Sequence, residues 1–141
     1  KAPAGGSSGQ SAVSSGQSAV LAWPSLGKIS SLFGMRNGKP HQGIDIVRDK
    51  GLDIRAAAAG TVEYAGTMRG YGKTLIIDHG NGVKTLYAHN RALYVSKGAR
   101  VKRGAVVAKM GETGIVSGIH LHFEVIVNGK HKNPLNYLPN R

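Results

Sequence analysis

Short segments in which hydrophobic and polar residues alternate recur from Trp23 to the end of the chain, separated by glycines. Alternation with period two places successive side chains on opposite faces of a β-strand. Asn81-Gly82 lies between two such segments, and this dipeptide favours the tight turn of a β-hairpin. The predicted strands are 43–47, 60–65, 74–78, 83–89, 105–110 and 120–127. No amphipathic helix is expected, so the pattern predicts an all-β fold, a compact antiparallel β-sandwich.

The first 22 residues follow a different pattern and consist mainly of alanine, glycine, serine, glutamine and valine. The sequence Ser-Gly-Gln-Ser-Ala-Val occurs twice in them, at 8–13 and at 15–20. Such a composition provides little to bury, so we expect residues 1–22 to be a flexible linker and residues 23–141 to be one domain. The chain begins at Lys1 without a recognisable signal peptide, which predicts a mature or trimmed fragment.

The composition is strongly basic, with 19 lysines and arginines against 7 acidic residues and a formal net charge of +12. Such a surface attracts polyanions: nucleic acid, an anionic membrane or an anionic cell-wall polymer. Nucleic acid is disfavoured, because few aromatic residues accompany the basic ones. The absence of cysteine excludes thiol catalysis, disulfides and cysteine-ligated metal sites, and it fits an exported protein. No hydrophobic run approaches the ~20 residues that span a bilayer.

Four of the six histidines lie in patterns that suit a metal ion. His41 stands four residues before Asp45, and we expect it on a loop that leads into the strand carrying Asp45. His120 and His122 are two residues apart in a predicted strand, so they share one face of that strand. His89 ends another predicted strand. These elements together predict a metal site, whereas a His-x-His pair alone is a weak signal.

Two histidines and one carboxylate form a suitable ligand set for zinc. A catalytic zinc keeps three protein ligands and one water, and it lowers the pKa of that water towards ~7. Further histidines can transfer protons, because the ordinary pKa of imidazole is ~6.5. The histidines and the carboxylate therefore predict three ligands and two catalytic partners.

Three other residues near these motifs have less specific interpretations. Glu124 shares the face of the His-x-His pair, where it either orients a metal ligand or is a solvated strand residue. His79 lies beside the predicted Asn-Gly turn and is expected to be structural, with a hydrogen bond to the backbone. His131 lies between two lysines and is expected to be an ordinary surface residue.

In combination, these motifs resemble those of the M23 metallopeptidases, the LytM or lysostaphin-type family. The three signatures are His41-x3-Asp45, Tyr87-Ala88-His89 and His120-Leu121-His122. Supporting segments lie at 32–36, 70–82, 101–114 and 133–135. The resemblance extends from about Trp23 to Leu138, and its motifs are specific in combination.

The resemblance implies that His41, Asp45 and His122 bind Zn2+ and that His89 and His120 are the catalytic histidines. It also implies a groove over the β-sheet that carries the metal site and binds the substrate. That substrate would be the peptide cross-links of bacterial peptidoglycan.

We therefore expect a zinc metalloendopeptidase that is exported to the periplasm, the cell envelope or the exterior. Its expected partners are peptidoglycan cross-links and an anionic cell-wall polymer, with other cell-wall enzymes and divisome proteins as further candidates and no nucleic acid. Two other classes remain open: a non-catalytic LytM-type activator of cell-wall amidases or wall-binding module, and a basic polyanion-binding protein. Met35 stands where many members of the family have a tyrosine, so no tyrosine hydroxyl near His41 can be assigned to bind the oxyanion.

Overall fold

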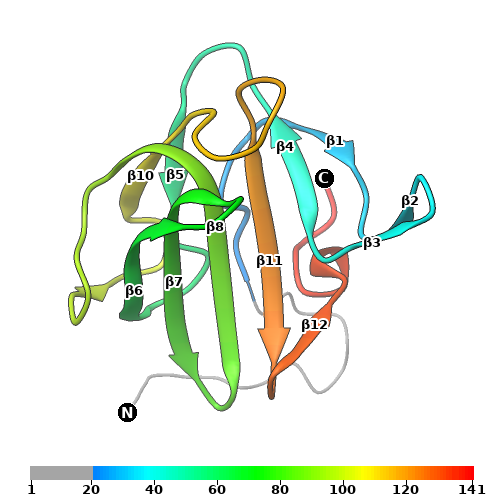
Figure 1. Ribbon diagram of the computed structural model, residues 1–141. Coiled ribbons are helices and arrows are strands. Elements are labelled where there is room, and N and C mark those ends of the chain that lie inside the picture. The colour runs from blue at the N-terminus through cyan, green and yellow to red at the C-terminus, as the bar shows by residue number, and fades with distance from the viewer. Residues whose placement is uncertain (1–20) are drawn as a thin grey trace.

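Antiparallel β-strands make up nearly all of the regular structure in the computed structural model, which describes residues 21–141 (Figure 1). The strands are β1 (Lys28–Ser31), β2 (Gly34–Arg36), β3 (Lys39–His41), β4 (Ile44–Val47), β5 (Asp53–Arg55), β6 (Gly60–Met68), β7 (Gly72–Gly80), β8 (Val83–Leu93), β9 (Arg100–Val101), β10 (Val106–Met110), β11 (Leu121–Val127) and β12 (Lys130–Lys132). The 3-10 turn η1 (Pro134–Asn136) is the one helical element in these residues. The predicted all-β antiparallel architecture is confirmed.

Ten of the strands form one sheet, whose main path runs β1-β4-β11-β8-β7-β6-β9. β10 joins β5 to β8, β12 pairs with β11, and β2 and β3 form a separate two-stranded sheet. In Figure 1, the orange β11 lies between the cyan β4 and the green β8, although these strands are far apart in the sequence. This order brings the three histidine-bearing signatures to one region of the sheet. The described residues include no helix that is long and apolar enough to cross a membrane.

Alternation along β4 and β11 separates a core face from a polar face, as the sequence pattern predicts. Ile44 and Ile46 of β4, and Leu121, Phe123 and Val125 of β11, are fully buried in the hydrophobic core. The residues between them carry the polar side chains of the opposite face. Core packing on one face therefore fixes which side chains the other face presents.

The Asn-Gly turns form as the sequence predicts. Asn81 and Gly82 connect β7 to β8 with φ angles of 54° and 80°. Both angles lie in the left-handed region that asparagine and glycine tolerate best. Asn128 and Gly129 connect β11 to β12 in the same way, with φ angles of 52° and 81°.

The packed structure includes Leu21, two residues before the predicted start of the domain. Leu21 is buried, and its backbone N–H donates to the Tyr137 carbonyl at 2.9 Å. The N–H of Ala22 donates to the Ala57 carbonyl at 2.8 Å. The rest of the predicted linker, residues 1–20, lies outside the described residues.

Candidate metal centre and groove

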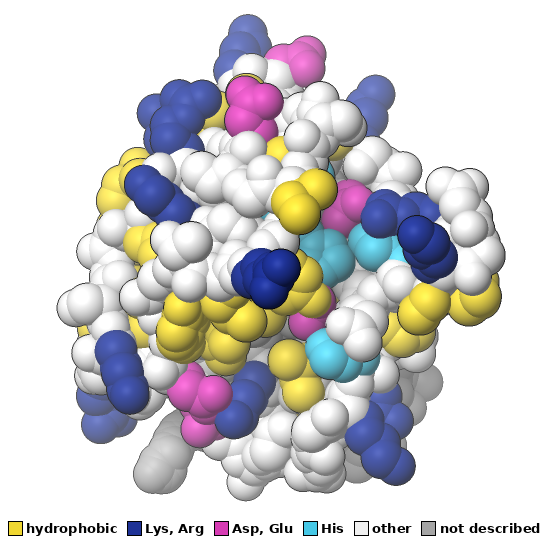
Figure 2. Space-filling view, in the orientation of Figure 1, with side chains coloured by type: hydrophobic (Ala, Val, Ile, Leu, Met, Phe, Trp, Pro, Cys, Tyr) yellow, Lys and Arg dark blue, Asp and Glu magenta, His cyan; other side chains and the backbone are white. Residues whose placement is uncertain are grey.

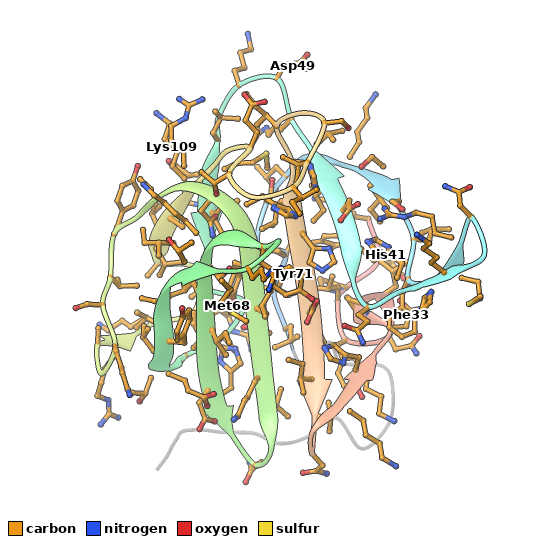
Figure 3. The ribbon with its side chains drawn as sticks, viewed as in Figure 1. Phe33, His41, Asp49, Met68, Tyr71 and Lys109 are labelled. Carbon is orange, nitrogen blue, oxygen red and sulfur yellow. The ribbon has the colours of Figure 1, made fainter. Side chains whose placement is uncertain are left out.

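A groove with a volume of about 950 Å³ crosses the polar face of β4 and β11. Figure 2 shows histidine side chains at the bottom of a hollow on this face, beside acidic and basic side chains. Figure 3 labels His41 at the end of β3 and Tyr71 between β6 and β7, and both residues line the groove. The groove predicted over the sheet is therefore present, and its walls come from four separate parts of the chain. Those parts are residues 30–47, 70–71, 89 and 115–122.

The strand register brings the three predicted ligands together. His122 of β11 lies directly opposite Asp45 of β4. His41 ends β3 rather than lying on a loop, and its ring lies 5.2 Å from that of His122. The Asp45 Oδ1 atom is 3.3 Å from His41 Nε2 and 2.9 Å from His122 Nδ1. All three side chains are buried, and their ligand atoms lie within 4.8 Å of one another, so they could hold a metal ion.

Hydrogen bonds behind the cluster orient the two imidazoles. His41 Nδ1 donates to the Leu32 carbonyl at 2.8 Å, so its Nε2 atom carries the lone pair in the neutral ring. That Nε2 atom is buried and has no hydrogen-bond partner among the described residues. His122 Nε2 donates to Glu124 at 2.8 Å, which directs Nδ1 towards Asp45. A cation would satisfy the unpaired His41 nitrogen, so the donor set fits a metal.

Glu124 is the centre of a buried network rather than a solvated strand residue. Its side chain is 1% exposed, and its Oε2 atom accepts from His122 and, at 2.6 Å, from the Tyr71 hydroxyl. His131 Nε2 lies 2.8 Å from the other carboxylate oxygen. The interpretation of His131 as an ordinary surface residue is therefore wrong, because the β11–β12 hairpin folds it back onto Glu124.

The acidic and basic groups of the cluster shift one another's pKa values in the metal-free protein. Burial alone would raise the pKa of Asp45, but the hydrogen bond from His122 and the nearby imidazoles lower it to about 2. Burial alone would lower the pKa of His122, but its bonds to Asp45 and Glu124 raise it to about 9. His122 thus holds a proton between two carboxylates, and a bound cation would replace that proton.

Arg36 supports the candidate ligand Asp45 from the outer side. Its Nη1 atom donates to Asp45 Oδ2 at 2.9 Å and to Ser31 Oγ at 2.9 Å. The two Asp45 oxygens therefore have separate contacts, Oδ2 with the arginine and Oδ1 with the histidines.

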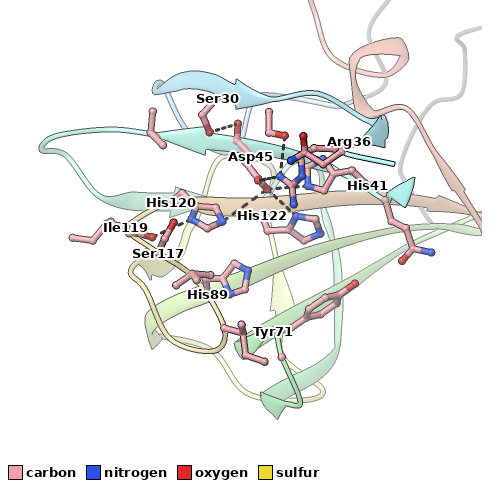
Figure 4. Close-up of a pocket in the computed structure, with 18 of the residues that line it drawn as sticks. Ser30, Arg36, His41, Asp45, Tyr71, His89, Ser117, Ile119, His120 and His122 are labelled. Carbon is pink, nitrogen blue, oxygen red and sulfur yellow. Dashed lines mark hydrogen bonds and ion pairs between the residues drawn. The ribbon is translucent and has the colours of Figure 1, made fainter. Parts of the chain in front are cut away.

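His89 and His120 face each other beside the cluster, with ring centroids 4.9 Å apart (Figure 4). His89 Nδ1 donates to the Thr113 carbonyl at 2.8 Å, and His120 Nδ1 donates to the Gly118 carbonyl at 3.0 Å. Both Nε2 atoms remain available for a ligand. Burial lowers the pKa of His89, so its ring is neutral at neutral pH and Nε2 can accept a proton.

His89 has a φ angle of 65°, a conformation that non-glycine residues adopt rarely and at a cost of about 1–3 kcal/mol. Its N–H donates to the Tyr71 carbonyl at 2.8 Å, which ties the strained residue to the turn between β6 and β7. The same turn places the Tyr71 ring 5.5 Å from the ring of His122. A tyrosine thus reaches the cluster from a different segment than Met35, which is 72% exposed.

Sequence reasoning did not identify Tyr71, Arg36 or Thr113 as parts of the site. Tyr71 lies between two glycines with positive φ angles, and that Gly-Tyr-Gly pattern is the one local signal that marked it. His79 has the expected structural role: its Nδ1 atom donates to the Ala59 carbonyl at 2.8 Å.

Comparison with curated proteins gives relatives of several kinds. A lipoprotein NlpD/LppB homolog of Pseudomonas aeruginosa is 45% identical over 121 residues, covering 85% of this chain and 40% of the relative. The murein hydrolase activator NlpD of Escherichia coli is 46% identical over 120 residues, covering 84% and 31%. The DD-carboxypeptidase/endopeptidase Mpg of Neisseria meningitidis is 40% identical over 115 residues, covering 77% and 26%. The chain thus spans well under half the length of these three relatives.

Solved structures with the same fold include two peptidases. A zinc-containing peptidase from Vibrio cholerae superposes with a TM-score of 0.74 at 31% identity, covering 83% of this chain and 39% of that one. The catalytic domain of lysostaphin from Staphylococcus simulans superposes with a TM-score of 0.71 at 26% identity, covering 77% and 90%. Residues 39–134, which include all five predicted site residues, match the sequence profile of peptidase family M23. The chain belongs to peptidase family M23.

Proposed function

We propose that this protein is a zinc-dependent endopeptidase that hydrolyses peptide cross-links of bacterial peptidoglycan. The observation that carries the proposal is the buried Nε2 atom of His41, which lacks a hydrogen-bond partner beside Asp45 and His122. An unsatisfied buried polar atom costs about 1–3 kcal/mol, and a cation shared by the three residues would remove that cost. The zinc-containing relative from Vibrio cholerae supports zinc as that cation.

His41, Asp45 and His122 would hold the ion through Nε2, Oδ1 and Nδ1. Bound zinc would polarise the scissile carbonyl and lower the pKa of water. Glu124 and the Leu32 carbonyl keep the two imidazoles in the orientation that this binding requires.

His89 and His120 provide the proton transfers of the reaction. Hydrolysis breaks the amide C–N bond, adds the hydroxyl of water to the carbonyl carbon and delivers the proton to the departing nitrogen. Each histidine anchors Nδ1 on a backbone carbonyl and presents Nε2 to the groove. Neutral His89 can accept the proton from water, and the two histidines can hydrogen-bond the carbonyl oxygen or return the proton to nitrogen.

Digestion of purified sacculi by the zinc-loaded protein, with mass analysis of the released fragments, tests this function. We expect cross-linked fragments to disappear and fragments with new amine and carboxyl ends to appear. A chelator should abolish the reaction, and added zinc should restore it. Folded, zinc-loaded His120→Ala is the matched control and should leave cross-links intact. Cross-links that survive prolonged incubation with folded, zinc-loaded protein would refute the proposal.

A second candidate function is activation of a separate murein hydrolase, because one relative at 46% identity bears that name. The two functions predict different behaviour for His120→Ala. An activator would still stimulate a partner hydrolase after this substitution, whereas an endopeptidase would lose its own cleavage. Because one of the relatives is a lipoprotein, we also propose that the protein acts in the cell envelope, with peptidoglycan, an anionic wall polymer and other cell-wall enzymes as its partners.

A further inference from the structure

Arg36 lies in the groove wall with half of its side chain exposed to solvent (Figure 4). Its contacts with Asp45 and Ser31 are both made by Nη1. The guanidinium group has five N–H donors, and Nη1 carries two of them. The three donors of Nε and Nη2 have no hydrogen-bond partner among the described residues. The Arg36 guanidinium is thus held in place through Nη1, while Nε and Nη2 form an open edge.

The two formal charges that line the groove, on Arg36 and Asp45, balance each other in the metal-free protein. Asp45 and Arg36 are the only charged lining residues in the described part of the chain, apart from the histidines. The Asp45 carboxylate is surrounded by Arg36 and three histidines, so it has little capacity to repel an anion. A cation in the metal site would then make the groove positive. The groove therefore favours a ligand with a negative group close to the reacting bond.

A carboxylate fits the open edge of Arg36 best. The paired N–H groups of a guanidinium match the two oxygens of a carboxylate, and such charge-assisted pairs are stronger than neutral hydrogen bonds. Because Nη1 of Arg36 contacts Asp45, a carboxylate bound by Nε and Nη2 would be separated from this candidate ligand by the width of one guanidinium group. On a peptide substrate, that place belongs to a residue flanking the scissile bond.

We propose that Arg36 is a specificity-determining residue that binds a free carboxylate next to the scissile amide. The inference rests on the proposed endopeptidase function and names its substrate class. A direct D-Ala–diaminopimelate cross-link has a carboxylate on the carbon that bears the scissile nitrogen. An internal bond of a glycine bridge has no such group. The groove is therefore built for directly cross-linked diaminopimelate peptides rather than for glycine bridges.

Two cross-linked peptide dimers that differ in one group test the proposal. In one dimer the carbon bearing the scissile nitrogen carries a carboxylate, and in the other it carries a carboxamide. We expect the zinc-loaded protein to cleave the carboxylate dimer with a kcat/KM at least about tenfold higher. Arg36→Gln should lose this preference, and Arg36→Lys should retain part of it. Arg91→Gln, which removes the same charge outside the groove, should keep the full preference.

The ratio of the kcat/KM values for the two dimers shows whether Arg36 binds the substrate carboxylate or only supports Asp45. If Arg36 only positioned Asp45, Arg36→Gln would lower zinc content and slow both dimers equally, leaving the ratio unchanged. Equal cleavage of both dimers by the original protein would also overturn the proposal while leaving the endopeptidase function intact. If neither dimer is cleaved, the endopeptidase function fails. Binding of both dimers to zinc-loaded protein then decides the inference, since an Arg36-dependent preference for the carboxylate supports it and equal affinity overturns it.

Discussion

At the scale of single residues, each candidate ligand has one atom directed at the centre and another held by a neighbour. Leu32 holds His41, Glu124 holds His122 and Arg36 holds Asp45. Such outer contacts fix the ring and carboxylate orientations before a metal arrives, and their loss usually weakens metal binding. The outer contacts are thus as testable as the ligands themselves.

The candidate ligands and the candidate catalytic histidines should respond differently to substitution. We expect His122→Ala to lose zinc and activity together, because it removes a ligand. His89→Ala and His120→Ala should keep most of the zinc and lose roughly 10²–10⁴ in rate. Elemental analysis after gel filtration and initial rates on the same samples measure both properties. If His120→Ala lost the metal and His122→Ala kept it, the roles within this pair would be reversed.

His131 should influence zinc affinity although it is not a ligand. His131→Ala removes a donor from the buried Glu124 carboxylate, and we expect zinc binding to weaken by roughly 10- to 100-fold. His131→Gln keeps an N–H donor and should recover most of the affinity. Competition with a chromophoric chelator measures the change. Lys132→Ala on the same strand is the control and should have no effect. Unchanged affinity in His131→Ala would contradict this role.

At the scale of elements, a partly buried chain of hydrogen bonds connects β7 and β8 to the segment before β6. The Ala57 N–H donates to the Tyr87 hydroxyl, which lies 2.7 Å from Thr85 Oγ1. Thr85 lies 2.7 Å from His79 Nε2, and His79 Nδ1 donates to the Ala59 carbonyl. With neutral His79, its Nε2 atom accepts from Thr85, and Thr85 accepts from the Tyr87 hydroxyl, so each hydroxyl proton has a partner. A proton on Nε2 would make Thr85 the donor to Tyr87 and leave the Tyr87 hydroxyl proton without this acceptor.

The place of His79 in this chain of hydrogen bonds predicts that the stability of the protein depends on pH. Burial lowers the pKa of His79 from its ordinary 6.5, so below about pH 6.5 the unfolded chain binds a proton before the folded chain does. The free energy of unfolding should therefore decrease as the pH falls through this range. We expect thermal unfolding of metal-free His79→Asn to show a weaker decrease between about pH 7 and about pH 5 than the original protein. If the stabilities of the two proteins fell equally over this pH range, His79 would be excluded as a source of the pH dependence.

The long elements could be predicted from the sequence because their signals are local. The alternation of hydrophobic and polar residues over 120–127 predicts both the strand and its buried face, and Asn81-Gly82 predicts the hairpin. The short strands could not be predicted, since two to four residues are too few to show a period and owe their shape to a partner strand. These strands are β1, β2, β3, β5, β9 and β12. The contacts of Tyr71 and His131 with Glu124 could not be predicted from the sequence either, because they join segments that meet only in the folded sheet.

At the scale of the whole molecule, the basic surface should control attachment to the cell wall. All but one unit of the +12 net charge belongs to the described residues, since Lys1 is the only charged residue before Leu21. Exposed charges are screened over ~8 Å at physiological salt, so co-sedimentation of zinc-free protein with sacculi should weaken steeply as salt rises. Cleavage of a small neutral peptide should change much less. Binding that is independent of salt would leave the basic surface without this role.

The first and last segments of the described chain lie side by side. The Arg141 guanidinium stacks 3.7 Å above the Trp23 ring and donates to the carbonyls of Ser25 and Gly27. The Trp23 indole donates to the Pro139 carbonyl at 2.8 Å. Leu21 lies beside Tyr137, whereas Arg141 reaches Ser25 and Gly27, so the two segments run antiparallel. A segment attached before Leu21 and one attached after Arg141 would therefore leave the domain at opposite ends of this pair. Circular permutation of the unit, or its insertion into a surface loop of another protein, would consequently need a linker that spans the length of this pair.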